Sequence, residues 1–144
     1  MEILNRKARY DYELLDKFEA GIVLTGTEIK SIRNGGANLK DSYAIVKNNE
    51  VFLLNMHISV YKQGNQFNHD ENRTRKLLLH KNEINKINDK ISIKGLTLVP
   101  VKLYFKNGLA KIELAIAKGK HTYDKKETIK QRDIERETKK ELKY

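Results

Sequence analysis

The sequence of 144 residues contains no cysteine and a single proline. Without thiols, neither a disulfide-stabilised scaffold nor a zinc or iron–sulfur site with thiolate ligands can form. No segment approaches the roughly 20 apolar residues of a membrane-spanning helix, and the opening residues MEILNRKARY include no apolar signal region. We therefore expect a cytoplasmic protein that does not associate with membrane.

Catalytic and nucleotide-binding motifs are also missing. The patterns G-x-S-x-G, G-x-x-x-x-G-K-[ST] and H-E-x-x-H do not occur in the sequence. His69, Asp70 and Glu71 are three possible metal ligands, but neighbouring residues of a loop rarely converge on one ion. We expect no enzyme, no metal site and no cofactor.

Positive charge is the strongest compositional signal. The chain has 29 Lys and Arg against 19 Asp and Glu, a net charge of +10, and 33% of its residues are charged. A basic domain attracts polyanions, chiefly nucleic acid. The alternative is a lysine-rich composition that carries no function.

The clearest local structure is a β-hairpin around Asn107-Gly108, a pair that suits a type I′ turn. This register makes one face entirely apolar and opposes Lys102 to Glu113 and Tyr104 to Lys111 on the other. The apolar pairs are Phe105–Ala110, Leu103–Ile112, Val101–Leu114 and Val99–Ile116. A second hairpin is predicted at Asn48-Asn49, pairing residues 44–47 with 50–53.

Two short helices interrupt the strands. A mainly extended segment over 10–24 leads into Thr25-Gly26-Thr27-Glu28, a capping box that predicts a helix ending at Asn34-Gly35-Gly36. Ile29 and Ile32 are its expected inner face. A second helix is predicted over 81–93, with Ile84, Ile87 and Ile91 inward and Gly95 as its stop. Pro100 predicts an edge or the start of a strand.

These patterns predict a mainly β fold with short helices, an OB-like antiparallel β-barrel, although a β-sandwich fits the pattern as well. We expect the barrel over residues 1–118 and a basic C-terminal tail over 119–144. The tail has too few large apolar residues for a core, so we expect it to be disordered when free and to form a helix on meeting a polyanion. A permanently solvated tail is the alternative.

Three basic clusters are candidates for nucleic-acid contacts. Residues 5–12 interleave cations, an amide and tyrosines, as RNA-binding surfaces do, and residues 73–76 and 118–121 add further cations. The candidates from these clusters are Asn5, Lys7, Tyr12, Arg73, Arg75, Lys76, Lys118 and Lys120.

With these motifs the sequence resembles the SsrA-binding protein (small protein B) family over nearly its whole length. The resemblance rests on many blocks in the same order: residues 5–8, 18–22, 26–31, 38–43, 73–79, 95–97, 117–120 and 123–126. It implies an OB-like barrel without catalytic activity. It also implies binding to the tRNA-like domain of tmRNA, and delivery with elongation factor Tu to the decoding centre and mRNA channel of stalled ribosomes, as a monomer.

The resemblance also assigns residues. It implies RNA contacts at Glu19, Leu78 and Lys111, and a ribosome-interacting element that includes Asp124-Lys125-Lys126. Because a carboxylate repels phosphate, Glu19 should either accept hydrogen bonds from base or ribose donors or hold a basic partner in place. The pattern alone would make Leu78 a core residue. The tail candidates are Tyr123, Asp124, Lys125, Lys126, Arg132 and Arg136.

The sequence departs from the family pattern at four positions. The family usually has His at Tyr10 and often Pro at Val60 and Glu71, and it commonly has Arg at Lys126. Lys cannot form the bidentate phosphate fork of Arg. A general RNA-binding or ribosomal OB protein without preference for tmRNA remains the alternative function.

Overall fold

The computed structural model describes residues 2–60 and 68–120. In chain order the elements are β1 (Glu2–Leu4), α1 (Arg6–Asp11), β2 (Tyr12–Ile22), α2 (Gly26–Arg33), β3 (Ala37–Asn38), β4 (Tyr43–Lys47), β5 (Glu50–Leu54), β6 (His57–Ile58), β7 (Arg75–Leu78), α3 (Lys81–Ile91), β8 (Leu96–Lys106) and β9 (Leu109–Gly119). None of the helices in these ranges is long and apolar enough to cross a membrane.

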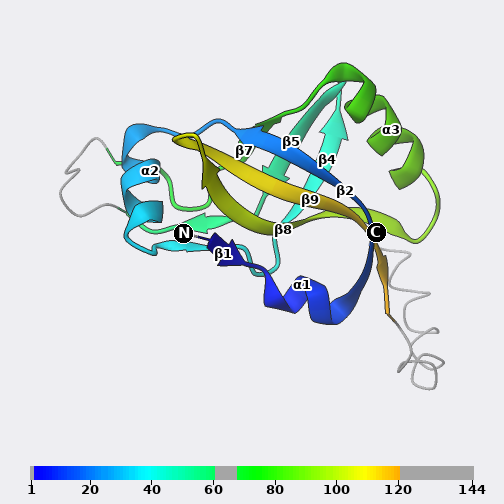
Figure 1. Ribbon diagram of the computed structural model, residues 1–144, viewed down its shortest axis with the longest axis horizontal. Coiled ribbons are helices and arrows are strands. Elements are labelled where there is room, and N and C mark those ends of the chain that lie inside the picture. The colour runs from blue at the N-terminus through cyan, green and yellow to red at the C-terminus, as the bar shows by residue number, and fades with distance from the viewer. Residues whose placement is uncertain (1, 61–67, 121–144) are drawn as a thin grey trace.

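The strands close into an antiparallel barrel. Pairing runs from β8 through β4, β5, β7 and β2 to β9, and β9 pairs with β8 again. β1 joins β8 beyond β4, while β3 and β6 form a separate two-stranded sheet. α2 and α3 lie at opposite ends of the barrel (Figure 1). The predicted mainly β fold with an OB-like barrel and short helices is confirmed.

The core fills the barrel interior and seals both ends. Ile32 of α2 and Ile87 of α3 are completely buried and join one cluster with apolar side chains from the barrel strands. The two helices therefore close the ends of the barrel, because each packs a branched apolar side chain into the core where the strands leave the end open. Removing an inserted side chain would leave a cavity, which typically costs about 2–5 kcal/mol.

The predicted hairpins are present, with one error of register. The turn at Asn48-Asn49 has the expected pairs throughout. Around Asn107-Gly108 the predicted pairs hold from Phe105–Ala110 to Lys102–Glu113, but a bulge between Pro100 and Lys102 shifts every later pair by one residue. Pro100 therefore opposes Leu114, and the predicted pairs Val101–Leu114 and Val99–Ile116 are wrong.

Proline explains where the bulge occurs. Pro has no backbone N–H to donate, so sheets accept it mainly at bulges and unpaired edges. On the side of β8 away from β9, Leu98 pairs with β4 and Lys102 pairs with β1. Pro100 lies between these two ladders, so the strand tolerates it without being an edge over its length.

The segment before β2 differs from the prediction of a strand starting at residue 10. Residues 6–11 form α1, which Asn5 caps: its Oδ1 accepts from the Ala8 backbone N–H at 3.1 Å. The Asn5 Nδ2 donates to the Pro100 carbonyl at 2.8 Å and so ties α1 to β8. A helix of six residues is too short to show the apolar periodicity on which the prediction relied.

The other two helices match their signals closely. The capping box of α2 is formed, because Thr25 accepts from the Glu28 N–H and Glu28 accepts from the Thr25 N–H. Ile32 is buried as predicted, whereas Ile29 is only half-buried. α3 ends at Ile91, two residues earlier than predicted.

The stop after α2 leads to a stability prediction at Gly36. An added β-carbon there would lie 2.5 Å from Ser31 Oγ and 3.0 Å from the Ser31 carbonyl oxygen. We expect Gly36→Ala to lower the free energy of unfolding by about 1–3 kcal/mol, measured by urea denaturation. Gly26→Ala is the control, because nothing lies within 4 Å of its added β-carbon. Equal midpoints for the two variants would contradict this packing account.

Candidate nucleic-acid interface

Outward-facing side chains of four neighbouring strands form a row across the barrel. Register pairs Gly21 of β2 with Leu78 of β7 on one side and with Lys111 of β9 on the other, and Lys111 pairs with Tyr104 of β8. These residues alternate with buried ones such as Ala20, so they share the outer surface. With Glu19 and Lys106 we call this surface the Gly21 face.

Gly21 leaves a shallow place at the centre of this face, and Leu78 leans over it. An added β-carbon on Gly21 would meet Leu78 Cβ at 3.5 Å and Leu78 Cδ1 at 3.7 Å. Leu78 nevertheless keeps 52% of its surface exposed, so it is not the core residue that its apolar neighbours suggest. An exposed leucine beside a lysine offers an apolar contact for a base or ribose next to a phosphate contact.

Glu19 lies two residues from Gly21 on the same side of β2, and its carboxylate is held from β8. The Tyr104 hydroxyl donates to Glu19 Oε2 at 2.5 Å, and Lys106 Nζ lies 3.6 Å from Oε1. The hydrogen bond from Tyr104, followed by the positive charges of Lys106 and Lys111, holds the pKa of Glu19 below its ordinary value. Burial and this hydrogen bond raise the pKa of Tyr104, which stays a donor.

The three residues that the resemblance assigned to RNA therefore meet on one face. Glu19, Leu78 and Lys111 come from β2, β7 and β9, and the strand register brings them around Gly21. Sequence reasoning placed Tyr104 opposite Lys111 but missed its bond to Glu19. That bond spans from β2 across β9 to β8, and no local pattern reveals the pairing of β2 with β9.

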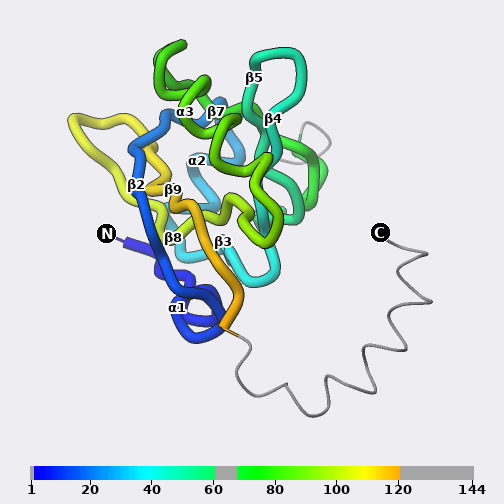
Figure 2. The backbone as a smooth tube through the Cα atoms, turned by 90° about the vertical axis from the view of Figure 1, so that its right-hand side faces the viewer, coloured from blue at the N-terminus to red at the C-terminus, as the bar shows by residue number. Residues whose placement is uncertain are grey.

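A second basic region lies around α1, where β2 starts and β9 ends side by side (Figure 2). Its exposed cations are Arg6, Lys7, Arg9, Lys40, Lys118 and Lys120. Lys7 pairs with Asp11 at 3.0 Å and with Asp41 at 3.5 Å. We call this region the α1 end; along β9 it lies roughly 23 Å from Lys111, at about 3.3 Å per residue.

Two candidates of the α1 end have inward roles. Asn5 is only 4% exposed, and both polar atoms of its side chain are used within the fold: Oδ1 caps α1 and Nδ2 donates to the Pro100 carbonyl. The expectation of an RNA contact at Asn5 is therefore wrong for its side chain. Tyr12 is half-buried against a small apolar cluster that includes Ala8, and it pairs with Gly119.

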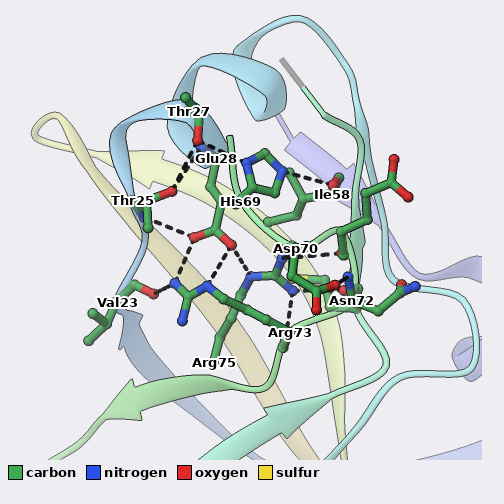
Figure 3. A network of polar contacts seen from close by, with 12 residues as sticks. Val23, Thr25, Thr27, Glu28, Ile58, His69, Asp70, Asn72, Arg73 and Arg75 are labelled. Carbon is green, nitrogen blue, oxygen red and sulfur yellow. Dashed lines mark hydrogen bonds and ion pairs between the residues drawn. The ribbon is translucent and has the colours of Figure 1, made fainter. Parts of the chain in front are cut away.

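The basic run of residues 73–76 divides into inward and outward side chains. Arg75 is completely buried: its Nε donates to Glu28 Oε2 at 2.8 Å, and its Nη1 donates to the Met56 carbonyl at 2.7 Å. Arg73 donates from Nε and Nη2 to both oxygens of Glu28, at 2.9 and 2.7 Å (Figure 3). The predicted RNA contact of Arg75 is wrong, because its guanidinium has no exposed surface.

Lys76 is the outward member of the run. It is exposed and pairs with Glu50 of β5 at 2.9 Å, while Arg73 is partly exposed beside Glu28. Alternation along β7 explains the division, because Arg75 and Leu77 point inward while Lys76 and Leu78 point outward. Lys76 therefore remains available to a ligand, whereas the guanidinium of Arg73 is held by Glu28 and the Val23 carbonyl.

Glu28 is the centre of this buried network. Burial by itself would raise the pKa of Glu28, but the hydrogen bonds from Arg73, the Thr25 N–H and Arg75 outweigh it, so the pKa lies below its ordinary value. For Arg75, burial outweighs the hydrogen bond and the charge of Glu28, so the pKa of Arg75 is lowered. One carboxylate thus caps α2 and fixes two guanidiniums.

The possible metal cluster at residues 69–71 is used otherwise. His69 bonds Thr27 Oγ1 and the Ile58 carbonyl, both at 2.9 Å, and so links α2 to β6. Within residues 2–60 and 68–120, no three His, Asp or Glu side chains are placed to hold a metal ion. The tail candidates Tyr123, Asp124, Lys125, Lys126, Arg132 and Arg136 lie outside the described residues.

Comparisons with known proteins now identify the family. The family model described as "SmpB protein" matches residues 2–144 of this chain. The chain belongs to the SmpB family. It is 61% identical over 139 residues to the SsrA-binding protein of Ligilactobacillus salivarius, a match that covers 96% of this chain and 90% of the relative. A second SmpB relative, the SsrA-binding protein of Geobacillus thermodenitrificans, is 62% identical over 92% of this chain and 86% of its own length.

A solved structure agrees with the SmpB assignment. The chain in "tmRNA-SmpB: a journey to the center of the bacterial ribosome" superimposes with a TM-score of 0.74 at 45% identity. The match covers 92% of this chain and 94% of that one. At this identity and coverage, the barrel described above is the SmpB fold.

The buried network leads to a stability prediction. Glu28→Gln leaves two guanidiniums without their carboxylate, so we expect a loss of about 3–5 kcal/mol in urea unfolding at pH 7. Glu50→Gln removes an exposed pair with Lys76 and should cost less than about 1 kcal/mol. Similar losses in the two variants would contradict the structural role of Glu28.

The same network predicts a pH dependence. Because the pKa of Glu28 is lowered on folding, its stabilising contribution is present above the ordinary value of 4.5 and is lost as pH falls through the native value. The difference in stability between the wild type and Glu28→Gln should therefore shrink in acid. A difference that is constant across this range would show that ionised Glu28 is not the stabilising group.

Proposed function

We propose that this protein binds the tRNA-like domain of tmRNA and delivers it to stalled ribosomes for trans-translation, in which incomplete proteins are tagged for degradation. The observation that best supports this proposal is the Gly21 face, where Glu19, Leu78 and Lys111 lie on one outer surface. The SmpB family supports the assignment, since its curated members are named SsrA-binding proteins and a matched structure is named for tmRNA and the ribosome. The proposed activity is binding without catalysis.

The Gly21 face combines the contacts that structured RNA requires. Lys111 supplies a cation for phosphate, exposed Leu78 supplies an apolar surface, and Glu19 supplies an acceptor for base or ribose donors. Arg73 and Lys76 add positive charge near β7. Phosphate contacts position the RNA, whereas the acceptor of Glu19 and the apolar surface of Leu78 can distinguish one part of the RNA from another.

The α1 end is the proposed ribosome-facing side. Lys7, Lys118 and Lys120 lie there, roughly 23 Å from Lys111 at about 3.3 Å per strand residue, so one RNA elbow need not cover both regions. The chain leaves the barrel at this end. We propose that residues 119–144 enter the vacant mRNA channel beside the decoding centre. We also propose that the protein acts as a monomer and that elongation factor Tu binds the aminoacylated tmRNA together with it.

A general RNA-binding OB protein is the competing function, because a basic barrel alone would satisfy it. Competition binding of tmRNA, tRNA and an unstructured RNA at one fixed physiological salt concentration separates the two. The proposal predicts clear preference for tmRNA and tRNA over the unstructured RNA, with tmRNA preferred. Equal affinities for all three would support the general binder.

Lys111→Ala tests the Gly21 face directly. Because Lys111 is on the outer surface, the variant should keep the wild-type melting temperature but bind the tRNA-like domain about three- to tenfold more weakly. The slope of log affinity against log salt should fall by about one. Lys86→Ala on α3 removes an exposed cation elsewhere and is the matched control. A large loss of melting temperature would show that Lys111 is structural.

Truncation after Lys120 tests the division between barrel and tail. The barrel should stay folded, because every core residue described above precedes Gly119. We expect most tmRNA affinity to remain while tagging of stalled products is lost, with both measured on the same protein. A parallel loss of affinity and tagging would place the tail in the tmRNA-binding site, and retention of both would make it dispensable.

A further inference from the structure

The contact between Tyr104 and Glu19 joins an exposed carboxylate to a side chain two strands away. The hydroxyl reaches from β8 over β9 to β2, where it donates to Oε2 at 2.5 Å. The Glu19 side chain is 40% exposed and lies on the outer surface. An exposed glutamate side chain that bonds only to water moves among several rotamers. The direct bond from Tyr104 restricts Glu19 to rotamers in which Oε2 faces the hydroxyl.

We propose that Tyr104 is a positioning residue that holds the Glu19 carboxylate as an oriented acceptor for hydrogen-bond donors of the bound RNA. The donors that fit are base amino and imino groups and ribose 2′-hydroxyls. This inference rests on the function proposed above and deepens it, because it names the residue that orients Glu19 toward the RNA.

The chemistry of a carboxylate beside RNA supports this role. An ionised carboxylate repels phosphate, so it favours binding only where it meets donors with fixed geometry. It has about four acceptor positions, and the hydroxyl of Tyr104 occupies one of them. The remaining positions of Glu19 stay available on the exposed side, in a direction that the bond to Tyr104 fixes.

Lys106 cannot replace Tyr104 in this task. Its Nζ lies 3.6 Å from Glu19 Oε1 on a side chain that is 58% exposed. A flexible exposed lysine loses its partner readily when phosphates approach, and it then contributes to phosphate binding. Tyr104, in contrast, is restrained by its strand and by Lys102, whose Nζ lies 5.5 Å from the ring centre.

Several charged groups surround Glu19 and shape any pH dependence. Lys106 on β8 and Lys111 on β9 favour its ionised form. Around the adjoining hollow lie Glu2 of β1, Lys17 of β2, Lys102 of β8 and Glu113 of β9. Because these neighbouring groups are charged as well, the pH effect of Glu19 has to be isolated by comparison with Glu19→Gln.

The experiment is a double-mutant cycle on affinity for the tRNA-like domain, from about pH 3.5 to pH 8 at constant salt, so that the range includes the ordinary pKa of a glutamate. Tyr104→Phe should keep the melting temperature but weaken binding about fivefold near neutral pH. Without the phenol the pKa of Glu19 rises, so affinity should begin to fall at a higher pH than in the wild type. Tyr43→Phe, on β4, is the control.

The cycle separates failure of this inference from failure of the proposed function. We expect Glu19→Gln to bind at least tenfold more weakly, with no further loss when Tyr104→Phe is added. Tyr104 does not act through Glu19 if the affinity losses of Tyr104→Phe and Glu19→Gln are additive in the double variant. The same conclusion holds if Tyr104→Phe does not raise the pH at which affinity begins to fall. If Glu19→Gln binds weakly but Tyr104→Phe binds normally, this inference alone fails. If Glu19→Gln binds as the wild type or more tightly, the proposed Gly21 face fails with it.

Discussion

The buried carboxylate of Glu28 is the constraint on which the RNA-facing surface depends. It accepts from both Arg73 and Arg75 while it caps α2, so one side chain joins a helix to β7. Burying the charges of Glu28 and Arg75, with Arg73 partly buried beside them, is expensive, and only complete pairing compensates for it. Arg75 also donates to the carbonyls of Met56 and Glu71, which ties the segments on both sides of residues 61–67 to the same point.

This network fixes the register of β7. The strand has four residues and pairs with β2 at Gly21 and Ile22 only. A slip by one residue would turn Lys76 inward and Arg75 outward, and it would also bury Leu78. Anchoring Arg75 on Glu28 forbids that slip, so Leu78 stays outside, next to Gly21. An ionic interaction in the core therefore determines which apolar side chain reaches the surface.

Much of the fold follows from local sequence signals. Asn107-Gly108 and the capping box at Thr25 predicted a hairpin and a helix that the structure contains. The bulge between Pro100 and Lys102 was missed, because alternation shows where a face is apolar but not where a strand gains a residue. The inward role of Arg75 was missed as well, since a cation in a basic run suggests surface. The alternation of Arg75 with inward Leu77 was the available signal.

The site itself depends on non-local pairing. Composition and basic clusters indicated nucleic acid, and the resemblance assigned Glu19, Leu78 and Lys111, but only the register of β7, β2 and β9 shows that they share a face. The partnership of Glu19 with Tyr104 is likewise a product of the closed barrel. A carboxylate on a basic RNA-binding surface becomes intelligible once its orientation and ionisation are fixed by neighbouring strands.

Hydroxyl-radical footprinting of the protein, read by mass spectrometry, tests the central claim that the Gly21 face receives the tRNA-like domain. Leu78 and Tyr10 are 52% and 81% exposed, so both should be oxidised in the free protein. With the isolated tRNA-like domain bound, the account predicts protection of Leu78 and Tyr104 and continued oxidation of Tyr10 at the α1 end. Protection of Tyr10 with Leu78 still oxidised would contradict it.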